Sequence, residues 1–192
     1  MSELVAPRIV GEDELIIEEW GKRVFHRRLA FAHGIEEYML WGGAKPPVIV
    51  FPATPDGKVI VLRQFRLAAN KFLYELPGGN PLWADRPEET ALRELRDEAG
   101  IAADRLVQVG PAQVYFDPAT DVNHYVPFLV TGCRRIAEPR LKKTEIAENM
   151  ALPIEQWDRM VDQGEIQDSK SIVTTYFALR RLGWLTVSPP RR

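Results

Sequence analysis

The chain has 192 residues, 45% of them hydrophobic and 27% charged, which suits one globular domain with a buried core and a small appendage. Its 25 Lys and Arg residues nearly balance its 27 Asp and Glu residues, so we expect neither a nucleic acid nor a membrane surface as its partner. The one cysteine, Cys133, excludes an intramolecular disulfide and a cysteine-rich zinc site.

The N-terminal region predicts exposed strands ahead of a main domain. It begins with acidic residues where a secretory signal is basic and then apolar, and no run reaches the length of a transmembrane helix, so we expect a cytoplasmic protein. Residues 13–41 mix short apolar runs with charges, which is typical of partly exposed strands. The stretch GGAKPP at 42–47 indicates a linker. We therefore expect an N-terminal β extension over 1–45 and a main domain over 46–192.

The segment after the linker predicts a β-hairpin, a further strand and a helix. Apolar runs rich in β-branched residues flank the turn PDG at 55–57 and predict the hairpin. KFLYELPGG at 71–79 is typical of a strand that ends in a glycine turn. Residues 86–99 predict a helix, because Pro87 suits its first turn and Gly100 suits a left-handed C-cap. Its expected buried stripe consists of Ala91, Leu92, Leu95 and Ala99.

The remaining chain predicts strands followed by two helices. We expect strands near 105–116, 122–132 and 146–152, and helices over about 154–163 and 170–182. Strands early in the chain with helices interspersed later favour the α+β class, with a mixed sheet packed between helices.

The first predicted helix carries a cluster of carboxylates that stability alone does not explain. Glu94 and Glu98 lie one turn apart with Asp97 between them, and like charges at this spacing repel. The expected apolar stripe lies elsewhere on the helix, so this acidic edge should face a groove or solvent. One interpretation is a solvated surface, and the other is a site for Mg²⁺ or Mn²⁺, since both ions prefer oxygen ligands. Gly78 and Gly79 favour the metal site, because a backbone without Cβ atoms can come close to a metal or a phosphate.

The stretch from Gly79 to Ile101 resembles the Nudix box, G-x5-E-x7-R-E-U-x-E-E-x-G-U, in which U is apolar. Seven of its nine specified positions match, and two carry Asp in place of Glu. The resemblance implies the Nudix fold, an α/β/α sandwich. In that family the first glutamate of the box pairs with its arginine, so we expect Asp85 either to pair with Arg93 or to act as an N-cap. The aligned positions are Gly79, Asp85, Arg93, Glu94, Leu95, Asp97, Glu98, Gly100 and Ile101.

Two further segments, LRQFR at 62–66 and YELPGG at 74–79, are similar to segments of ADP-ribose and nucleoside-diphosphate-sugar pyrophosphatases. This resemblance implies Mg²⁺- or Mn²⁺-dependent hydrolysis of the diphosphate bond in ADP-ribose or a nucleotide sugar such as GDP-mannose. The products would be a nucleoside monophosphate and a sugar phosphate, and residues 46–192 would be the catalytic domain. Two alternatives stay open: a nucleotide-sensing module without activity, and a clean-up enzyme for nucleoside triphosphates.

The same resemblance implies a role for each candidate site residue. The expected metal ligands are Glu94, Glu98, Asp97 and the carbonyl of Gly78. Arg66 and Gly79 are expected to bind the small-molecule nucleotide substrate, since guanidinium groups bind phosphates in bidentate fashion. Glu98 is also expected to be catalytic. For the general base, the acidic segment at 142–150 offers Glu148, which we favour, and Glu145.

The N-terminal strands carry more apolar surface than their own segment can bury. In the resembling subgroup such strands cross to a second subunit, so we expect a domain-swapped homodimer with shared active sites. The apolar residues concerned are Val24, Phe25, Leu29, Phe31, Met39 and Leu40.

Overall fold

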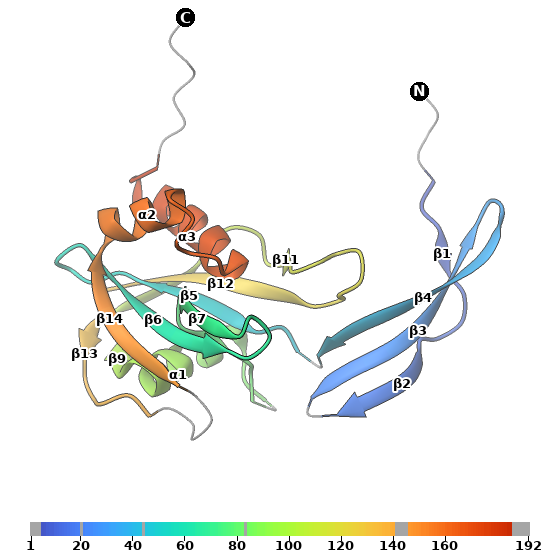
Figure 1. Cartoon of the computed structure of the whole chain (residues 1–192), viewed down its shortest axis with the longest axis horizontal. Coiled ribbons are helices and arrows are strands. Elements are labelled where there is room, and N and C mark those ends of the chain that lie inside the picture. Colours follow the sequence, from blue (N-terminus) through green and yellow to red (C-terminus); the bar gives the residue numbers. More distant parts are fainter. Residues whose placement is uncertain (1–4, 20, 44, 83, 141–145, 186–192) are drawn as a thin grey trace, which may run out of the picture. The chain divides into compact units, whose positions relative to one another are not determined.

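The chain forms two compact units (Figure 1). The N-terminal unit combines the residues up to Pro46 with Tyr115–His124, and the main unit combines Pro47–Val114 with the residues from Tyr125 onward. The structure is a computed structural model that describes residues 5–19, 21–43, 45–82, 84–140 and 146–185.

The N-terminal unit is an antiparallel sheet built around β3 (Lys22–Phe31). β4 (Gly34–Gly43) pairs with one edge of β3, and β1 (Arg8–Ile9) and β2 (Glu14–Glu19) pair with the other. The segment Tyr115–His124 joins this sheet at Trp41 of β4, whose N–H donates to the carbonyl of Thr120 at 3.1 Å. The strands predicted over 13–41 are confirmed.

The main unit contains two principal sheets and a short two-stranded one. The strands concerned are β5 (Val48–Pro52), β6 (Lys58–Arg66), β7 (Lys71–Glu75), β8 (Gly78–Gly79), β9 (Ile101–Ala102), β10 (Arg105–Gln108), β11 (Val114–Tyr115), β12 (His124–Thr131), β13 (Arg134–Arg135) and β14 (Ala147–Pro153). One principal sheet has the order β10–β12–β5–β8, with β5 and β12 parallel and the other neighbours antiparallel, and β11 pairs with β12. In the other, β6 lies between β14 and β7, and β13 pairs with β9 in the short sheet.

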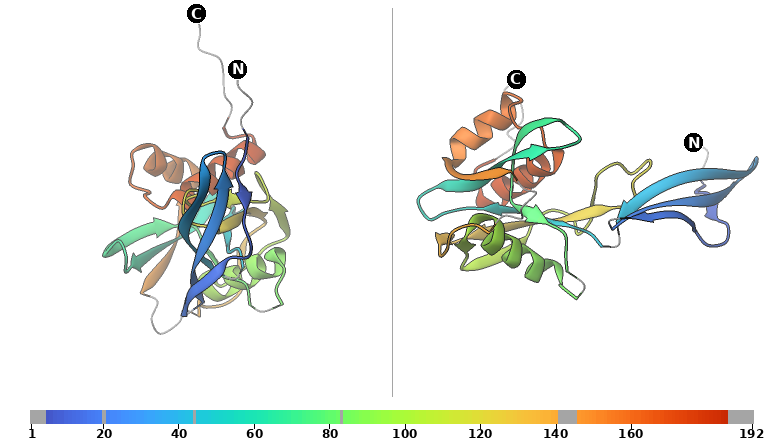
Figure 2. Two further views of the ribbon diagram at one scale, coloured as in Figure 1. Left: turned by 90° about the vertical axis from the view of Figure 1, so that its right-hand side faces the viewer. Right: turned by 60° about the horizontal axis from the view of Figure 1, so that its bottom comes forward.

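In the described part of the main unit, three helices cover these sheets from opposite sides. α1 (Pro87–Ala99) lies on one side, and α2 (Ile154–Asp162) and α3 (Ser169–Leu182) lie on the other (Figures 1 and 2). Because side chains alternate along a strand, β5 feeds both cores: Val48 and Val50 pack in the cluster with α1, and Phe51 packs in the cluster with α2 and α3. The predicted α+β class, with a mixed sheet between helices, is confirmed.

The predicted hairpin around residues 55–57 is wrong in its pairing, although both strands and the turn between them form. β5 uses one edge for β12 and the other for β8, whereas β6 uses its edges for β14 and β7. A single bridge between Ala53 and Val59 joins the two strands beside the turn. Since a strand has only two edges, β5 has none left for β6.

The three predicted helices are confirmed to within one residue at each end. Gly100 caps α1 in the left-handed conformation, with φ of 66°, as its sequence position indicated. The strand predicted near 105–116 is instead two strands, β10 and β11, because Gly110 takes φ of 67° and Pro111 cannot donate to a ladder.

Candidate active site

Helix α1 buries two carboxylates beside its apolar residues. Glu94 and Glu98 are 5% and 9% exposed, whereas Leu92, which was predicted to be buried, is 42% exposed. The predicted separation of the acidic edge from the apolar stripe is therefore wrong. At about 100° per residue, Glu98 lies only about 20° around the helix from Ala91, so it shares the buried side of α1.

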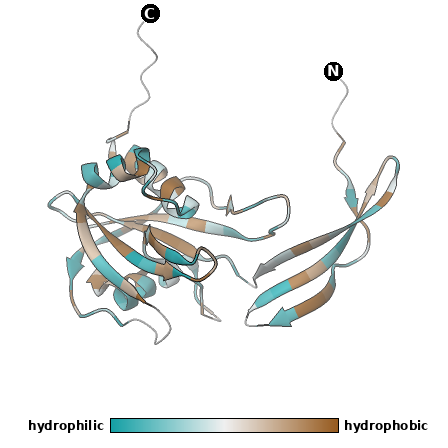
Figure 3. Cartoon of the chain, in the orientation of Figure 1, coloured by the Kyte–Doolittle hydropathy of each residue, from teal (hydrophilic) through white to brown (hydrophobic). Residues whose placement is uncertain are grey.

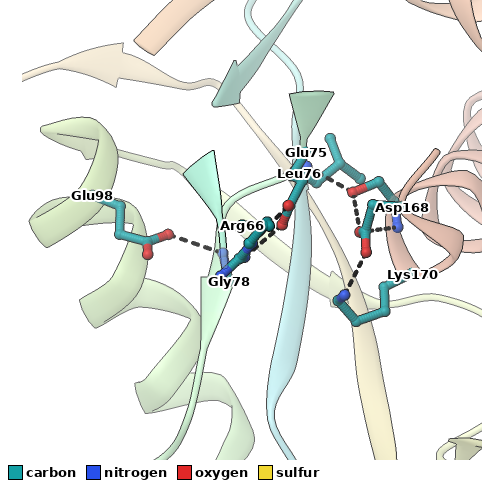
Figure 4. A network of polar contacts seen from close by, with 8 residues as sticks. Arg66, Glu75, Leu76, Gly78, Glu98, Asp168 and Lys170 are labelled. Atoms are coloured by element: carbon teal, nitrogen blue, oxygen red, sulfur yellow. Dashed lines mark hydrogen bonds and ion pairs between the residues drawn. The ribbon is translucent and has the colours of Figure 1, made fainter. Parts of the chain in front are cut away.

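The buried carboxylates meet the two glycines that follow β7. Gly78 and Gly79 were predicted to form a turn, but they pair with β5 as the short strand β8; we keep the name glycine turn for these two residues. The N–H of Gly78 donates to Oε2 of Glu98 at 3.1 Å (Figure 4). A Cβ atom on Gly79 would lie 2.5 Å from the carboxyl carbon of Glu94, closer than nonbonded atoms allow. Glycine at position 79 therefore lets the Glu94 carboxylate lie directly against the turn. The structure thus brings together four of the predicted site residues: Gly78, Gly79, Glu94 and Glu98.

Arg93 ties the loop before α1 to the site. Its Nε donates to Oδ2 of Asp85 at 3.1 Å, its Nη1 to Oε1 of Glu94 at 2.7 Å and its Nη2 to the carbonyl of Asn80 at 2.8 Å. Burial opposes the charge on Arg93, but Glu94 and Asp85 outweigh burial and raise the pKa of the guanidinium. Asp85 therefore pairs directly with Arg93 despite its short side chain, and the N-cap position belongs to Arg86.

Arg66 is held by a second buried carboxylate. Its Nε and Nη2 donate to the two carboxylate oxygens of Glu75 at 2.7 and 2.5 Å, and Glu75 is only 2% exposed (Figure 4). This bidentate pair, with smaller contributions from Asp168 and Glu98, raises the pKa of Arg66 although burial opposes it. Arg66 therefore keeps its positive charge next to the glycine turn.

The structure does not bring Glu148 to this cluster. Neighbouring side chains on a strand point to opposite faces, and Asn149 of β14 faces α1, where its Nδ2 donates to the carbonyl of Glu98 at 2.6 Å. Glu148 thus points away from α1, pairs with Nη1 of Arg63 at 3.1 Å and is 58% exposed. Glu145, the other candidate base, lies outside the described residues.

The clustered residues suit a divalent cation. Glu94 and Glu98 offer two carboxylates and Gly78 a carbonyl, and Gly79 has no Cβ atom that would displace the Glu94 carboxylate. Asp97 is only half-buried and lies about 120° around the helix from Ala91, so it stands apart from that pair. Within the described ranges, no group of three or more His, Cys, Asp and Glu side chains is arranged to hold a metal ion. Mg²⁺ needs no such group, since one or two carboxylates plus substrate phosphates and water are its usual ligands.

Sequence reasoning did not single out Glu75 or Asn149. Glu75 had a usable signal, because it is a charged residue between apolar ones directly before the glycine turn, and such a residue must be paired when buried. Asn149 had none, since its contact with Glu98 joins positions 51 residues apart in the chain.

The sequence of this chain is similar to sequences of known proteins. A sequence model of the NUDIX domain matches residues 44–173. The ADP-ribose pyrophosphatase of Bacillus subtilis (strain 168) is 32% identical over 127 residues, which cover 65% of this chain and 66% of the relative. The ADP-ribose pyrophosphatase of Mycobacterium tuberculosis (strain ATCC 25618 / H37Rv) is 31% identical over 147 residues, 70% of this chain and 69% of the relative. The matched part of the chain thus spans about two thirds of each relative's length.

A solved structure supports the fold assignment. The crystal structure of an ADP compounds hydrolase superposes with a TM-score of 0.80, covering 96% of this chain and 100% of that one at 15% identity. At this identity the likeness shows a shared fold. No helix in the described ranges is both long and apolar enough to cross a bilayer.

Proposed function

Since the chain belongs to the NUDIX domain family, we propose that it is a divalent-metal-dependent hydrolase of the diphosphate linkage in a nucleoside diphosphate joined to a sugar. The observation that carries the proposal is the pair of buried carboxylates, Glu94 and Glu98, against the glycine turn. Burying two like charges one helical turn apart costs free energy of folding. A helix shaped for stability alone would place such residues on its exposed side.

Each residue of the cluster has a distinct role in this proposal. Glu94, Glu98 and the carbonyl of Gly78 would hold Mg²⁺ or Mn²⁺, which when bound offsets phosphate charge and lowers the pKa of a water ligand. Arg66 would bind phosphate oxygens through Nη1 and the second N–H of Nη2, because Glu75 already engages Nε and one N–H of Nη2. Glu75 would thereby fix the direction in which Arg66 meets the substrate.

For the general base we propose Glu145 ahead of Glu148, which reverses the order expected from the sequence. The side chain of Glu148 lies on the face of β14 away from α1 and is paired with Arg63. Glu145 precedes β14 in the chain, within the same acidic segment. We propose to test Glu145→Gln first, with Glu148→Gln beside it, and we expect the larger loss of kcat from Glu145→Gln.

The proposed substrates are ADP-ribose first and a nucleotide sugar such as GDP-mannose second. Two relatives named ADP-ribose pyrophosphatase, each more than 30% identical to this chain, support the first choice. The products would be a nucleoside monophosphate and a sugar phosphate.

The deciding experiment follows the release of AMP or GMP from ADP-ribose, GDP-mannose and a nucleoside triphosphate in the presence of Mg²⁺. Glu98→Gln is expected to lower kcat/KM by about a hundredfold or more while the protein stays folded, because it removes a metal ligand. Glu88→Gln is the matched control: Glu88 is exposed on the first turn of the same helix, and its variant should keep full activity.

Two results would contradict the proposal in different ways. Binding of ADP-ribose without release of AMP by the wild-type protein would indicate a sensing module. Preferential cleavage of the triphosphate would indicate a clean-up enzyme.

We also propose that the protein is a homodimer formed through the N-terminal unit. Of the six apolar residues on which the dimer prediction rested, Met39 of β4 is 58% exposed, Leu40 is buried and the other four are half-buried. Further exposed apolar residues lie on β2, where Leu15, Ile16 and Ile17 are 53%, 44% and 51% exposed. Figure 3 shows the hydrophobic stretch of β2 in brown. Exposed apolar side chains on a sheet favour a protein interface, and a second copy of this strand unit would bury them.

A further inference from the structure

One amide side chain joins the helix of the candidate site to strand β14. Nδ2 of Asn149 donates to the backbone carbonyl of Glu98 at 2.6 Å. Glu98 lies in the last turn of α1, and the last four carbonyls of a helix have no donor within the helix. Asn149 therefore supplies from β14 a donor that α1 cannot supply for itself.

The same amide leaves its other polar atom without compensation. Oδ1 of Asn149 is buried and has no hydrogen-bond partner within the part of the chain that the structure describes. An unpaired buried acceptor lowers the free energy of unfolding, and an apolar side chain of similar size would avoid that cost. Packing alone therefore does not account for an amide at this position, whereas the contact with the Glu98 carbonyl does.

Glu98 is thus held at both ends. Asn149 holds its backbone carbonyl at 2.6 Å, and the N–H of Gly78 holds its carboxylate at 3.1 Å. A shift of the last turn of α1 would move the carboxylate away from the glycine turn, since a helix moves as a rigid segment.

The strand that carries Asn149 also connects to other parts of the site. β14 pairs with β6, where Asn149 lies opposite Leu62, and two and four residues further along β6 come Gln64 and Arg66 on the same face. A fixed distance between β14 and α1 therefore bears on both the metal ligands and Arg66.

We infer that Asn149 is a positioning residue: its side-chain amide fixes the last turn of α1 against β14 and so sets where the Glu98 carboxylate meets the glycine turn. The part of this inference that concerns catalysis rests on the proposed function. It predicts that the loss of the amide donor impairs turnover and metal activation more than it impairs substrate binding or folding.

The first test compares Asn149→Leu and Asn149→Asp, which both remove the N–H donor at nearly constant size, with Met150→Leu. Met150 is the next residue on β14 and packs in the core on the other face, so its variant reports on packing alone. For both Asn149 variants we expect kcat to fall about tenfold to a hundredfold and the Mg²⁺ concentration for half-maximal activity to rise, as for other residues that orient metal ligands. We expect KM to change by less than about twofold, because the substrate contacts remain.

The second test needs no activity. The amide of Gly78 is followed by NMR in the metal-free protein, through its chemical shift and its hydrogen-exchange rate. Asn149→Leu should change the shift and speed the exchange, because the Glu98 carboxylate no longer holds that N–H, and Met150→Leu should do neither. If Asn149→Leu does not fold, Asn149→Ala replaces it, since it removes the donor without adding bulk.

The outcomes separate this inference from the proposed function. If the wild-type protein hydrolyses none of the substrates, the proposed function is wrong. The NMR measurement on the Gly78 amide then tests the positioning role of Asn149 without any activity assay. An unchanged Gly78 amide in the Asn149 variants overturns the inference. It is also overturned if kcat falls equally in Met150→Leu, in step with the melting temperature, because the effect would then be one of packing.

Discussion

Gly79 shows, at the scale of one residue, how a missing atom can shape a charged site. The space that a Cβ would occupy holds the carboxylate of Glu94, which also accepts a hydrogen bond from Arg93 at 2.7 Å. Glycine and carboxylate therefore depend on each other: a side chain at one position displaces the group at the other.

Gly79→Ala is expected to lower kcat/KM about tenfold or more with little change in melting temperature. The added methyl group displaces the end of a flexible side chain, which costs little in folding but misplaces a proposed metal ligand. Gly164→Ala is the matched control, because Gly164 follows α2, has φ of 76° and has open space around it. That variant should lower the melting temperature through backbone strain and leave activity intact. The opposite pattern, with Gly79→Ala fully active, would contradict this account of the turn.

At the scale of elements, the start of α3 holds the end of β7 in place. The carboxylate of Asp168 caps α3 by accepting from the N–H of Ser171 at 3.0 Å and from its Oγ at 2.7 Å. Oγ of Ser171 in turn accepts from the N–H of Leu76 at 2.8 Å, two residues before Gly78 (Figure 4). A helix cap and the approach to the glycine turn thus share one buried hydroxyl.

Ser171→Ala is expected to lower the free energy of unfolding by about 1–3 kcal/mol, because the buried N–H of Leu76 loses its acceptor. Urea unfolding at an unchanged m-value measures this loss. Ser169→Ala, on the exposed first residue of the same helix, should stay within about 0.5 kcal/mol of the wild type. Equal stability of the two variants would show that the Ser171 hydroxyl contributes nothing.

What sequence reasoning captured at this scale was local. The ends of α1 are set by Pro87 and Gly100 within a few residues, so the helix was predicted almost to the residue. The pairing of β5 with β12 joins positions some 78 residues apart, as in Val48 and Val126. The turn after β5 suggested a hairpin with β6, and no sequence signal near β5 indicated β12 as its partner instead.

The candidate site divides in the same way. Glu94, Glu98 and the glycine turn were found from spacing, since they lie within 21 residues of one another. The direction of Glu148 depends on its register opposite Arg63, and the contact of Asn149 depends on where α1 packs. Both depend on tertiary structure, and the residues near them in the sequence do not predict either one.

At the scale of the whole molecule, the exposed apolar residues of the N-terminal unit bear on its assembly. Burying one isoleucine contributes about 1.5–3 kcal/mol, so several on each copy can stabilise a dimer. β2 and β4 carry them on strands that the unit itself leaves uncovered.

Ile16→Glu is expected to convert a dimer of the wild-type protein into a monomer, because the charge would be buried without a partner in the interface. Light scattering at micromolar concentration measures the mass. Ile136→Glu is the matched control, since Ile136 is 51% exposed on the main unit and should leave the mass unchanged. A monomeric wild-type protein would remove the homodimer proposal.

The segment Tyr115–His124 makes the N-terminal unit discontinuous in sequence. Asn123 accepts from the N–H of Gly43 at 2.8 Å, and Trp41 exchanges backbone hydrogen bonds with Thr120 and Val122. No single proteolytic cut can therefore release this unit intact. A chain shortened to begin at Pro47 would keep the ten residues Tyr115–His124 without their hydrogen-bonding partners. A truncation that tests the main unit by itself must therefore also replace these ten residues with a short turn from Val114 to Tyr125.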